Sequence, residues 1–408
     1  MQTIHINLVS EQLQPNLIPA FIDTSCQGVV LVLGDKTLLD KAERLTKLYQ
    51  GRGLPILWIS EGTSSHRLVQ LQKQANELIN WLATNHADKQ WMLNATCGTK
   101  PMALAFANAF NRYNSEHPET ASNGIPRALI FYTDSQNHEI PLLNEGVDYA
   151  LPWQAVMNLD EMLAASGFEI SHEIDLDNDD EIRSRAELTR YLGKQFQGPC
   201  QQMQSNLQGM ASKAYLDFPL NQNQAMPSVP HGPYAELYQR LVGANIIVWD
   251  GSSLQICFQS EDACRYLAGR WLEELTYLTA CECGFEQVAM SVEGIWSGSS
   301  VKLNSERGKN NEFDILICHN NQLLIIECKA KSWYERQKDE STNQDVVLKL
   351  ESLGRKLGGI YGERLLISAR QLPDEMVQRA KDNRIKLCDQ ADAHKIKATL
   401  QSYFDNMQ

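Results

Sequence analysis

The apolar positions of the first 135 residues follow two alternating patterns. Short uninterrupted apolar runs such as "GVVLVLG" are typical of strands that are buried on both faces. Between these runs, apolar side chains recur every three to four positions, which is the period of an amphipathic helix. The predicted strands are Thr3–Val9, Gly28–Gly34, Leu54–Ser60, Gln90–Asn94 and Arg127–Thr133, and the predicted helices are Lys36–Gln50, His66–Leu82 and Pro101–Phe110. This alternation predicts a parallel, doubly wound α/β sheet, which binds ligands at the carboxyl ends of its strands.

The pattern weakens after about residue 152 and becomes regular again near residue 235. Gln, Asn, Pro and Gly are frequent in between, so we expect a linker or a small helical region. We therefore divide the chain into an α/β domain (1–150), this connecting region (151–234) and a second α/β or α+β domain (235–408). The elements predicted in the second domain are a helix over Glu261–Cys283, strands at Phe285–Val292, a hairpin within Asn311–Lys331, a helix near Asp345–Leu357 and a strand at Arg364–Ser368.

The composition is that of a folded globular protein. At 408 residues the chain exceeds the size of one ordinary hydrophobic core, so we expect several domains. No apolar run approaches the roughly 18 residues of a membrane span, and the first residues lack the basic start of a signal peptide. We therefore expect a cytoplasmic protein without a membrane partner. The ten cysteines include no CxxC pair, so we expect most of them to be small buried hydrophobic residues.

The net charge of −13 argues against a surface that binds nucleic acid everywhere. The charge is uneven, however, because residues 301–370 hold 12 Lys and Arg against 10 Asp and Glu. Any nucleic-acid surface is therefore expected to be local.

One predicted strand-to-helix connection, "NATCGTKPMALAF", concentrates groups that bind anions. Thr96, Gly98, Thr99 and Lys100 place backbone donors, hydroxyls and a cation at a helix N-terminus, where phosphate is stabilised. Pro101 suits the first helical turn. The stretch is not a Walker loop, because Thr99 separates the glycine from the lysine. From these residues alone, a phosphate site and a simple capped turn both remain open.

The same connection resembles the signature of CARF domains, an N-x-T-G-G-T-K-x-M stretch. Cys97 stands where that signature usually has glycine. CARF domains are Rossmann-like dimers that bind cyclic oligoadenylates in CRISPR defence, so the resemblance implies a homodimer with such a ligand. It also implies a second ligand loop after the first strand, at Ser10–Glu11–Gln12, and Asp134 and Ser135 can line the same crevice. The matching positions are Asn94, Thr96, Gly98, Thr99, Lys100 and Met102, and the ligand-binding candidates are Ser10, Gln12, Thr96, Gly98, Thr99 and Lys100.

The second candidate site lies in "NEFDILICHNNQLLIIECKAK", where Asp314, Glu327 and Lys329 interrupt two apolar strands. Glu327 and Lys329 project to one face of their strand because side chains alternate. The Asn-Asn pair predicts a hairpin turn that brings Asp314 beside Glu327. Close carboxylates repel unless a cation lies between them, and oxygen ligands suit Mg²⁺ or Mn²⁺. A buried ion pair in a core strand is the alternative.

This D-x12-E-x-K spacing resembles the PD-(D/E)xK nuclease superfamily, although the proline position of that motif is not evident. The resemblance implies a further metal-binding glutamate on a preceding helix, for which "AGRWLEELTYL" offers Glu273 first and Glu274 second. It also implies that Glu312 can help to position metal or water. The candidate nucleic-acid contacts, each of which can equally be plain helix surface, are Gln344, Lys349, Arg355 and Lys356.

In order along the chain, the two resemblances match the CARF-fused effector nucleases of type III CRISPR systems. They imply a homodimeric nuclease that cyclic tetra-adenylate activates and that hydrolyses DNA, RNA or both with a divalent metal. Three alternatives remain: a repair or restriction nuclease without ligand control, a non-enzymatic sensor or DNA-binding regulator, and a pocket that cleaves its own cyclic ligand through Thr99 and Lys100.

Overall fold

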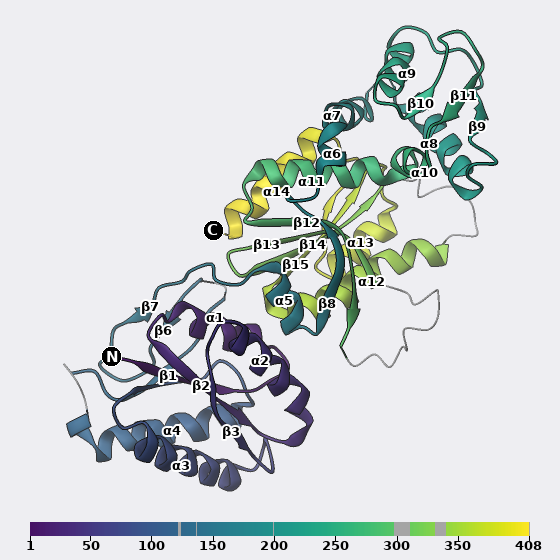
Figure 1. Ribbon diagram of the computed structural model, residues 1–408. Helices are drawn as coiled ribbons and strands as arrows, with labels where there is room; N and C mark the ends of the chain where they lie inside the picture. Colours follow the sequence, from purple (N-terminus) through teal and green to yellow (C-terminus); the bar gives the residue numbers. More distant parts are fainter. Residues whose placement is uncertain (121–123, 136, 199, 298–310, 331–339, 408) are drawn as a thin grey trace. The chain divides into compact units, whose positions relative to one another are not determined.

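The computed structural model describes residues 1–120, 124–135, 137–198, 200–297, 311–330 and 340–407 (Figure 1). The chain divides into two compact units: unit 1 comprises Met1–Glu169 and Leu357–Tyr361, and unit 2 comprises Ile170–Lys356 and Gly362–Gln408. Unit 1 therefore extends beyond the boundary expected at residue 150. Residues 170–234, expected as part of a linker region, belong to unit 2. Among the residues described, no helix is both long enough and apolar enough to cross a bilayer.

Unit 1 is built on a parallel five-stranded sheet in the order β3-β2-β1-β4-β5. Strand order changes direction beside β1, so the loops after β1 and β4 leave the sheet at the point where a doubly wound fold opens a crevice. The Rossmann-like arrangement predicted from the sequence is confirmed. The strands are β1 (Thr3–Leu8), β2 (Cys26–Leu33), β3 (Ile56–Glu61), β4 (Gln90–Asn94) and β5 (Ala128–Phe131).

Helices cover both faces of this sheet (Figure 1). Helices α3 and α4 bury Leu78 and Phe106 on one face, against Ile4, Ile6 and Val30 of the strands. Helices α1 and α2 lie on the other face. The burial of all six residues of β1 follows from this double cover. The helices are α1 (Gln14–Ile22), α2 (Leu39–Gly51), α3 (Leu68–Asn85), α4 (Lys100–Glu116) and α5 (Leu159–Ala165), and a short pair of strands is β6 (Ile140–Pro141) with β7 (Ala150–Leu151).

Unit 2 is built on a mixed six-stranded sheet in the order β16-β15-β14-β13-β12-β8. Strands β12, β13 and β14 are antiparallel neighbours, whereas β14, β15 and β16 run parallel. A mixed sheet of this kind, with helices packed on it, confirms a second domain that contains both helices and strands. The strands are β8 (Phe168–Ile174), β12 (Gln287–Trp296), β13 (Asn311–His319), β14 (Gln322–Lys329), β15 (Gly362–Ser368) and β16 (Lys386–Cys388).

Helices α7, α11 and α14 share a core with one face of this sheet, and α12 and α13 lie on the other side (Figure 1). The core includes Leu192, Leu275, Ile326 and Leu400. The helices are α6 (Asp180–Ser184), α7 (Ala186–Gln195), α11 (Trp271–Cys283), α12 (Glu340–Gly358), α13 (Asp374–Asp382) and α14 (Ala393–Met407).

Two parts of unit 2 differ from the expected elements. The region expected as a linker or a small helical region contributes the edge strand β8 and the strand β9 of a three-stranded sheet, and the long-range partners of these strands leave no local pattern in the sequence. The single helix expected over Glu261–Cys283 is interrupted, because Gly269 has non-helical angles of φ 168° and ψ −28°. The additional elements are α8 (Gln201–Leu216), β9 (Asn223–Ala225), α9 (Pro233–Gly243), β10 (Ile247–Val248), β11 (Gln255–Phe258), α10 (Glu261–Arg265) and a π-helical turn (Tyr266–Arg270).

Candidate active site and ligand-binding loops

The β13–β14 hairpin has the turn that the sequence predicted. Asn320 and Asn321 adopt positive φ angles of 47° and 62°, which asparagine tolerates well. The pairing of Ile315 with Ile326 sets the register, so Asp314 and Glu327 follow at the next position toward the open end of the hairpin. The two carboxylates thus leave the apolar core where these strands end.

The predicted trio of Asp314, Glu327 and Lys329 is brought together at this end. The Lys329 Nζ lies 2.6 Å from Glu327 Oε1 and 3.6 Å from Asp314 Oδ2. The backbone N–H of Cys328 donates to Asp314 Oδ2 at 2.7 Å, which fixes the direction of that carboxylate. All three side chains are largely buried, with 14%, 11% and 23% of their surfaces exposed.

Burial and crowding of like charge shift the pKa values of these groups. Burial, and then the charge of Glu327, raise the pKa of Asp314 to about 6. Burial alone would lower the pKa of the Lys329 ammonium, but Asp314 and Glu327 raise it above its usual value. The site therefore holds more negative charge than one ammonium offsets, and perturbed groups of this kind are typical of functional sites.

Neighbouring glutamates on α11 have different surroundings. Burial and the charge of Asp314 raise the pKa of Glu273, which places that carboxyl near the trio. Glu274 is fully buried and binds Arg185 through both of its oxygens, at 2.9 and 2.5 Å. Of the two helix glutamates considered from the sequence, Glu273 therefore faces the candidate site and Glu274 faces away from it.

The carboxylates of Asp314 and Glu327 fit a divalent metal by their chemistry, because they are hard oxygen donors with surplus negative charge. Among the described residues, however, no three His, Cys, Asp or Glu side chains are grouped closely enough to hold one ion. Glu273 thus does not complete a three-carboxylate set in this arrangement. The Lys329 ammonium instead contacts the carboxylates of Asp314 and Glu327.

The candidate nucleic-acid residues lie on α12, beyond the end of β14. Lys349 is exposed, and its charge lowers the pKa of Asp314, so it lies within electrostatic range of the site. Arg355 pairs with Glu351, and Lys356 Nζ lies 3.3 Å from the centre of the Trp296 ring. The side chain of Gln344 lies outside the described part of the structure.

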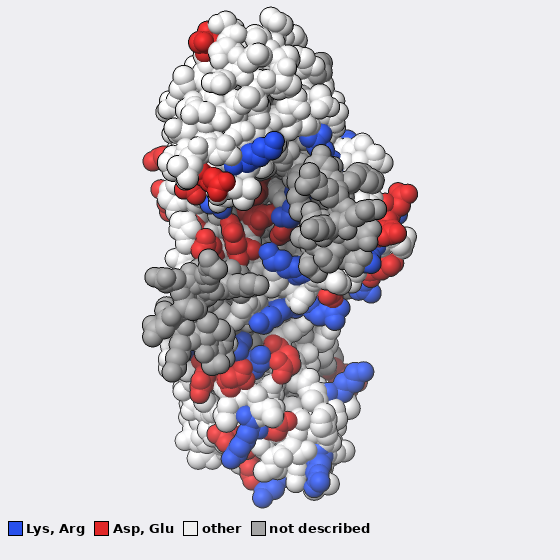
Figure 2. Space-filling model, turned by 90° about the vertical axis from the view of Figure 1, so that its right-hand side faces the viewer, with Lys and Arg blue, Asp and Glu red and all other residues white. Residues whose placement is uncertain are grey.

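Glu312 pairs with Arg265 at 3.3 Å, and its charge also contributes to the raised pKa of Glu273. On the described part of the face in Figure 2, basic and acidic side chains are interspersed rather than separated.

The predicted anion loop of unit 1 joins β4 to α4 at the crevice edge of the sheet. Thr99 caps α4 through its Oγ1, which accepts from Met102 N at 3.4 Å, and Pro101 lies in the first turn as predicted. Asn94 anchors the loop by accepting from Thr96 N at 3.0 Å and donating to Pro15 O at 2.7 Å.

Exposure and backbone geometry leave part of this loop open to a ligand. Lys100 is exposed at the start of α4, and Gly98 has a φ of +76° that favours glycine.

The predicted second loop lies next to the first, because β1 and β4 are neighbours and Asn7 pairs with Asn94. Ser10 Oγ donates to Gln12 O at 3.1 Å, and Cys97 Sγ lies 3.8 Å from the same oxygen.

The third predicted connection, after β5, is closed by a short bridge between Asp134 and Glu139. Ser135 lies near Tyr361 of the segment Leu357–Tyr361, which also belongs to unit 1. The ends of β1 and β4 therefore bring together the loops from which we expect ligand contacts.

Sequence reasoning missed two arginines that adjoin the catalytic candidates. Arg270 stands in the "GRWLE" stretch and lies 3.6 Å from Glu274, but nothing local shows which way it points. Arg185 is distant in sequence from the catalytic candidates and lies in the region expected as a linker or a small helical region. Only their three-dimensional partners identify them.

Residues 4–122 match the family described as the Card1 CARF domain, and residues 260–407 match the family described as the Card1-like endonuclease domain. No curated protein matches the chain. Protein VC1899 from Vibrio cholerae is structurally similar, with a TM-score of 0.80 and 20% identity over 99% of this chain and 98% of that one.

Can2 from Sulfobacillus thermosulfidooxidans, solved in complex with cyclic tetra-adenylate, has a TM-score of 0.73 and 20% identity over 100% of both chains. A type III CRISPR defence DNA nuclease activated by cyclic oligoadenylate has a TM-score of 0.51 and 14% identity over 91% of this chain and 46% of that one. At these identities the likeness to solved structures concerns the fold.

Proposed function

Since the chain belongs to the proteins that join a CARF domain to an endonuclease domain, we propose that it is a metal-dependent nuclease switched on by a cyclic oligoadenylate in type III CRISPR defence. The observation that carries the proposal is the contact of Lys329 with both Glu327 and Asp314 at the open end of the hairpin. The substrate is DNA, RNA or both. The activator we propose is cyclic tetra-adenylate, which the structurally similar Can2 binds.

In the proposed reaction, water attacks phosphorus and one P–O ester bond breaks, giving a phosphate monoester and a hydroxyl. Asp314 and Glu327 would hold a Mg²⁺ or Mn²⁺ ion, with Glu273 drawn in as a further ligand, and the bound ion would supply an activated water and offset phosphate charge. Lys329 donates hydrogen bonds to a non-bridging phosphate oxygen and stabilises the charge that accumulates there. The backbone N–H of Cys328 keeps the carboxylate of Asp314 aimed at the site.

The loops at the ends of β1 and β4 are proposed to bind the activator. Lys100 offers a cation at the N-terminus of α4, where the helix dipole also favours phosphate, and Thr96, Gly98 and Thr99 shape the loop around it. Ser10 and Gln12 contribute from the neighbouring loop. A second molecule of this chain would repeat these groups around a two-fold axis, which suits a ligand with four equivalent phosphates.

Exposed apolar residues near this loop support a homodimer. Leu104 on α4 is 63% exposed, and Leu68 and Val69 at the start of α3 are 48% and 79% exposed. Thr99 donates a hydrogen bond to Ser65 O and so joins the loop to the segment before α3. A partner subunit would bury these side chains beside the ligand.

The test is cleavage of supercoiled plasmid, single-stranded DNA and single-stranded RNA with Mn²⁺, with and without cyclic tetra-adenylate. We expect ligand-dependent cleavage that Glu327→Ala abolishes and that the exposed control Glu375→Ala on α13 leaves unchanged. Lys100→Ala should raise the ligand concentration needed for half-maximal activity, while the exposed Lys47→Ala on α2 should not.

Other outcomes distinguish the alternatives. Cleavage that ignores the nucleotide identifies a nuclease without ligand control. Tight nucleotide binding without any cleavage identifies a sensor. Loss of the cyclic ligand itself, abolished by Lys100→Ala, identifies a ligand-degrading pocket.

A further inference from the structure

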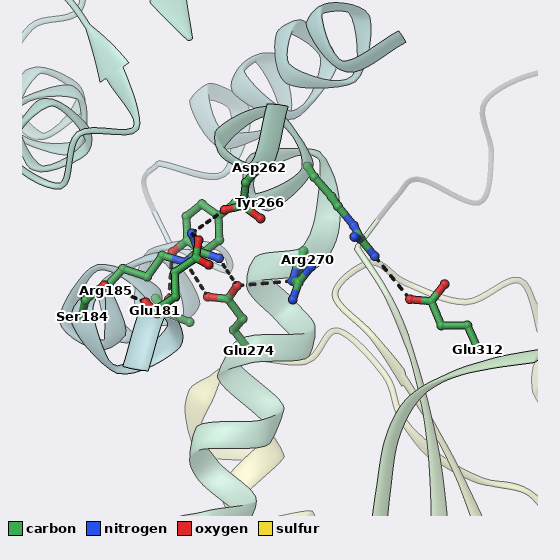
Figure 3. A network of polar contacts seen from close by, with 10 residues as sticks. Glu181, Ser184, Arg185, Asp262, Tyr266, Arg270, Glu274 and Glu312 are labelled. Atoms are coloured by element: carbon green, nitrogen blue, oxygen red, sulfur yellow. Dashed lines mark hydrogen bonds and ion pairs between the residues drawn. The ribbon is translucent and has the colours of Figure 1, made fainter. Parts of the chain in front are cut away.

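A buried ion pair joins Arg185 to Glu274, the residue that follows Glu273 on α11 (Figure 3). Arg185, between α6 and α7, binds both oxygens of Glu274 through its Nε at 2.9 Å and its Nη2 at 2.5 Å. The Glu274 side chain is 0% exposed and that of Arg185 is 8% exposed. Two parallel bonds of this kind restrict direction as well as distance.

Arg185 also contacts the chain on the other side of the helix interruption. Its Nη1 donates to Asp262 of α10 at 2.6 Å, and its guanidinium lies 4.6 Å from the centre of the Tyr266 ring. Asp262 and Tyr266 precede Gly269, whereas Glu274 follows it. The Arg185 guanidinium therefore binds the helical segments before and after the interruption at Gly269.

The orientation of Glu274 determines the orientation of its neighbour. Successive residues of an α-helix project about 100° apart around the axis. With Glu274 held toward Arg185, Glu273 lies on the face of α11 that also carries Thr276, whose Oγ1 lies 3.6 Å from Cys328 Sγ of β14, so Glu273 is turned toward the hairpin. A rotation of α11 about its axis would move Glu273 away from the site.

The chemistry of the pair suggests a role beyond stability. Burying an arginine and a glutamate costs desolvation energy, and apolar residues of similar volume often stabilise a core equally well. What apolar residues cannot reproduce is the directional grip of a guanidinium on a carboxylate.

We propose that Arg185 is a positioning residue for the nuclease reaction, and that its grip on Glu274 sets the rotation of α11 that keeps Glu273 on the helix face toward the hairpin, from which it would reach a bound metal. This inference rests on the proposed nuclease function. In this proposal neither Arg185 nor Glu274 contacts substrate.

The decisive variant is Arg185→Met with Glu274→Leu, which removes both charges and keeps most of the buried volume. The matched control is Arg190→Met with Glu282→Leu, because Arg190 and Glu282 join the same helices, α7 and α11, at 2.7 Å but with both side chains about half exposed. Measurements are kcat and KM for the cleaved nucleic acid, thermal unfolding, and Mn²⁺ affinity of the metal-free protein by calorimetry.

We expect the decisive variant to remain folded at the assay temperature, to bind Mn²⁺ about 10- to 100-fold more weakly and to lose kcat by a similar factor. Its KM should stay unchanged, because the substrate surface is untouched. Arg185→Lys should keep the charge yet recover little kcat, since an ammonium cannot bind both oxygens in the plane of the carboxylate.

Wild-type kcat and Mn²⁺ affinity in the decisive variant would overturn the inference and leave the pair a purely structural contact. The same losses in the control variant would also overturn it. If wild-type protein cleaves no nucleic acid, the proposed function fails, and the Mn²⁺ affinities of the variants still decide the role of Arg185.

Discussion

Replacing Gly98 with alanine tests whether the anion loop of unit 1 depends on glycine for both conformation and space. Gly98 has a φ of +76°, and a Cβ added there would lie 2.9 Å from Leu8 Cβ and 3.5 Å from Met102 Cβ. Leu8 is fully buried in β1, and its Cβ is attached directly to the backbone of the central strand. The strand or the loop must therefore move.

The expected loss of unfolding free energy in Gly98→Ala has two parts. A non-glycine residue in the left-handed region costs about 1–2 kcal/mol. Overpacking a buried position adds about 1–3 kcal/mol. Gly53 separates these parts, because its φ of +74° is nearly the same and no atom lies within 4 Å of an added Cβ. Gly98→Ala should thus destabilise unit 1 by about 1–3 kcal/mol more than Gly53→Ala does.

The assay is native-state hydrogen exchange of the amides of β1 and α4, with the amides of β13 and β14 as an internal reference. The extra destabilisation should accelerate exchange in β1 by roughly 5- to 150-fold relative to Gly53→Ala, since each 1.4 kcal/mol is a factor of ten. Cyclic tetra-adenylate should also bind more weakly to Gly98→Ala. Equal exchange rates in the two variants would refute the steric argument.

Three further predictions concern unit 1. Tyr49→Phe removes the hydroxyl that accepts from Asn7 Nδ2 at 2.7 Å and donates to Asn16 O at 2.6 Å, so thermal unfolding should show a loss of about 2 kcal/mol, whereas the exposed Tyr132→Phe should show none. Burial would raise the pKa of Asp23, but hydrogen bonds and charge from His5, Ser25 and Thr3 lower it below its usual value. Its ionised form thus adds stability above the unfolded-state pKa of about 3.9, and the deficit of Asp23→Asn in unfolding titrations should be constant at neutral pH and shrink below about pH 4. Leu104→Asp should shift sedimentation toward a monomer, and an unchanged dimer would place the subunit contact elsewhere.

Periodicity was enough to predict the sheet of unit 1, because β1, β2, β4 and β5 are buried on both faces and each long helix has one apolar stripe. The hairpin of unit 2 was predictable for the same local reason, with Asn320 and Asn321 marking the turn. Local signals failed where long-range partners decide the structure. β8 joins the second sheet beside β12, more than 100 residues further along the chain.

The candidate active site was partly readable. Spacing on two strands predicted the approach of Asp314, Glu327 and Lys329, since strand alternation and one turn determine it. Spacing cannot distinguish Glu273 from Glu274, because the choice depends on how α11 rotates. That rotation is associated with Arg185, which lies 89 positions before Glu274 and has no sequence relation to it.

The five residues Leu357–Tyr361 have a consequence for dissecting the protein into fragments. These residues belong to unit 1, where Ser166 donates a hydrogen bond to Leu357 O and Tyr361 is 2% exposed. Along the chain, however, they connect the end of α12 to β15 of unit 2. A fragment ending at Glu169 would therefore lack part of its own packing. A fragment beginning at Ile170 would expose Tyr361 to water. Neither cut yields an intact half, so the sensor and the nuclease are best studied as one uninterrupted polypeptide.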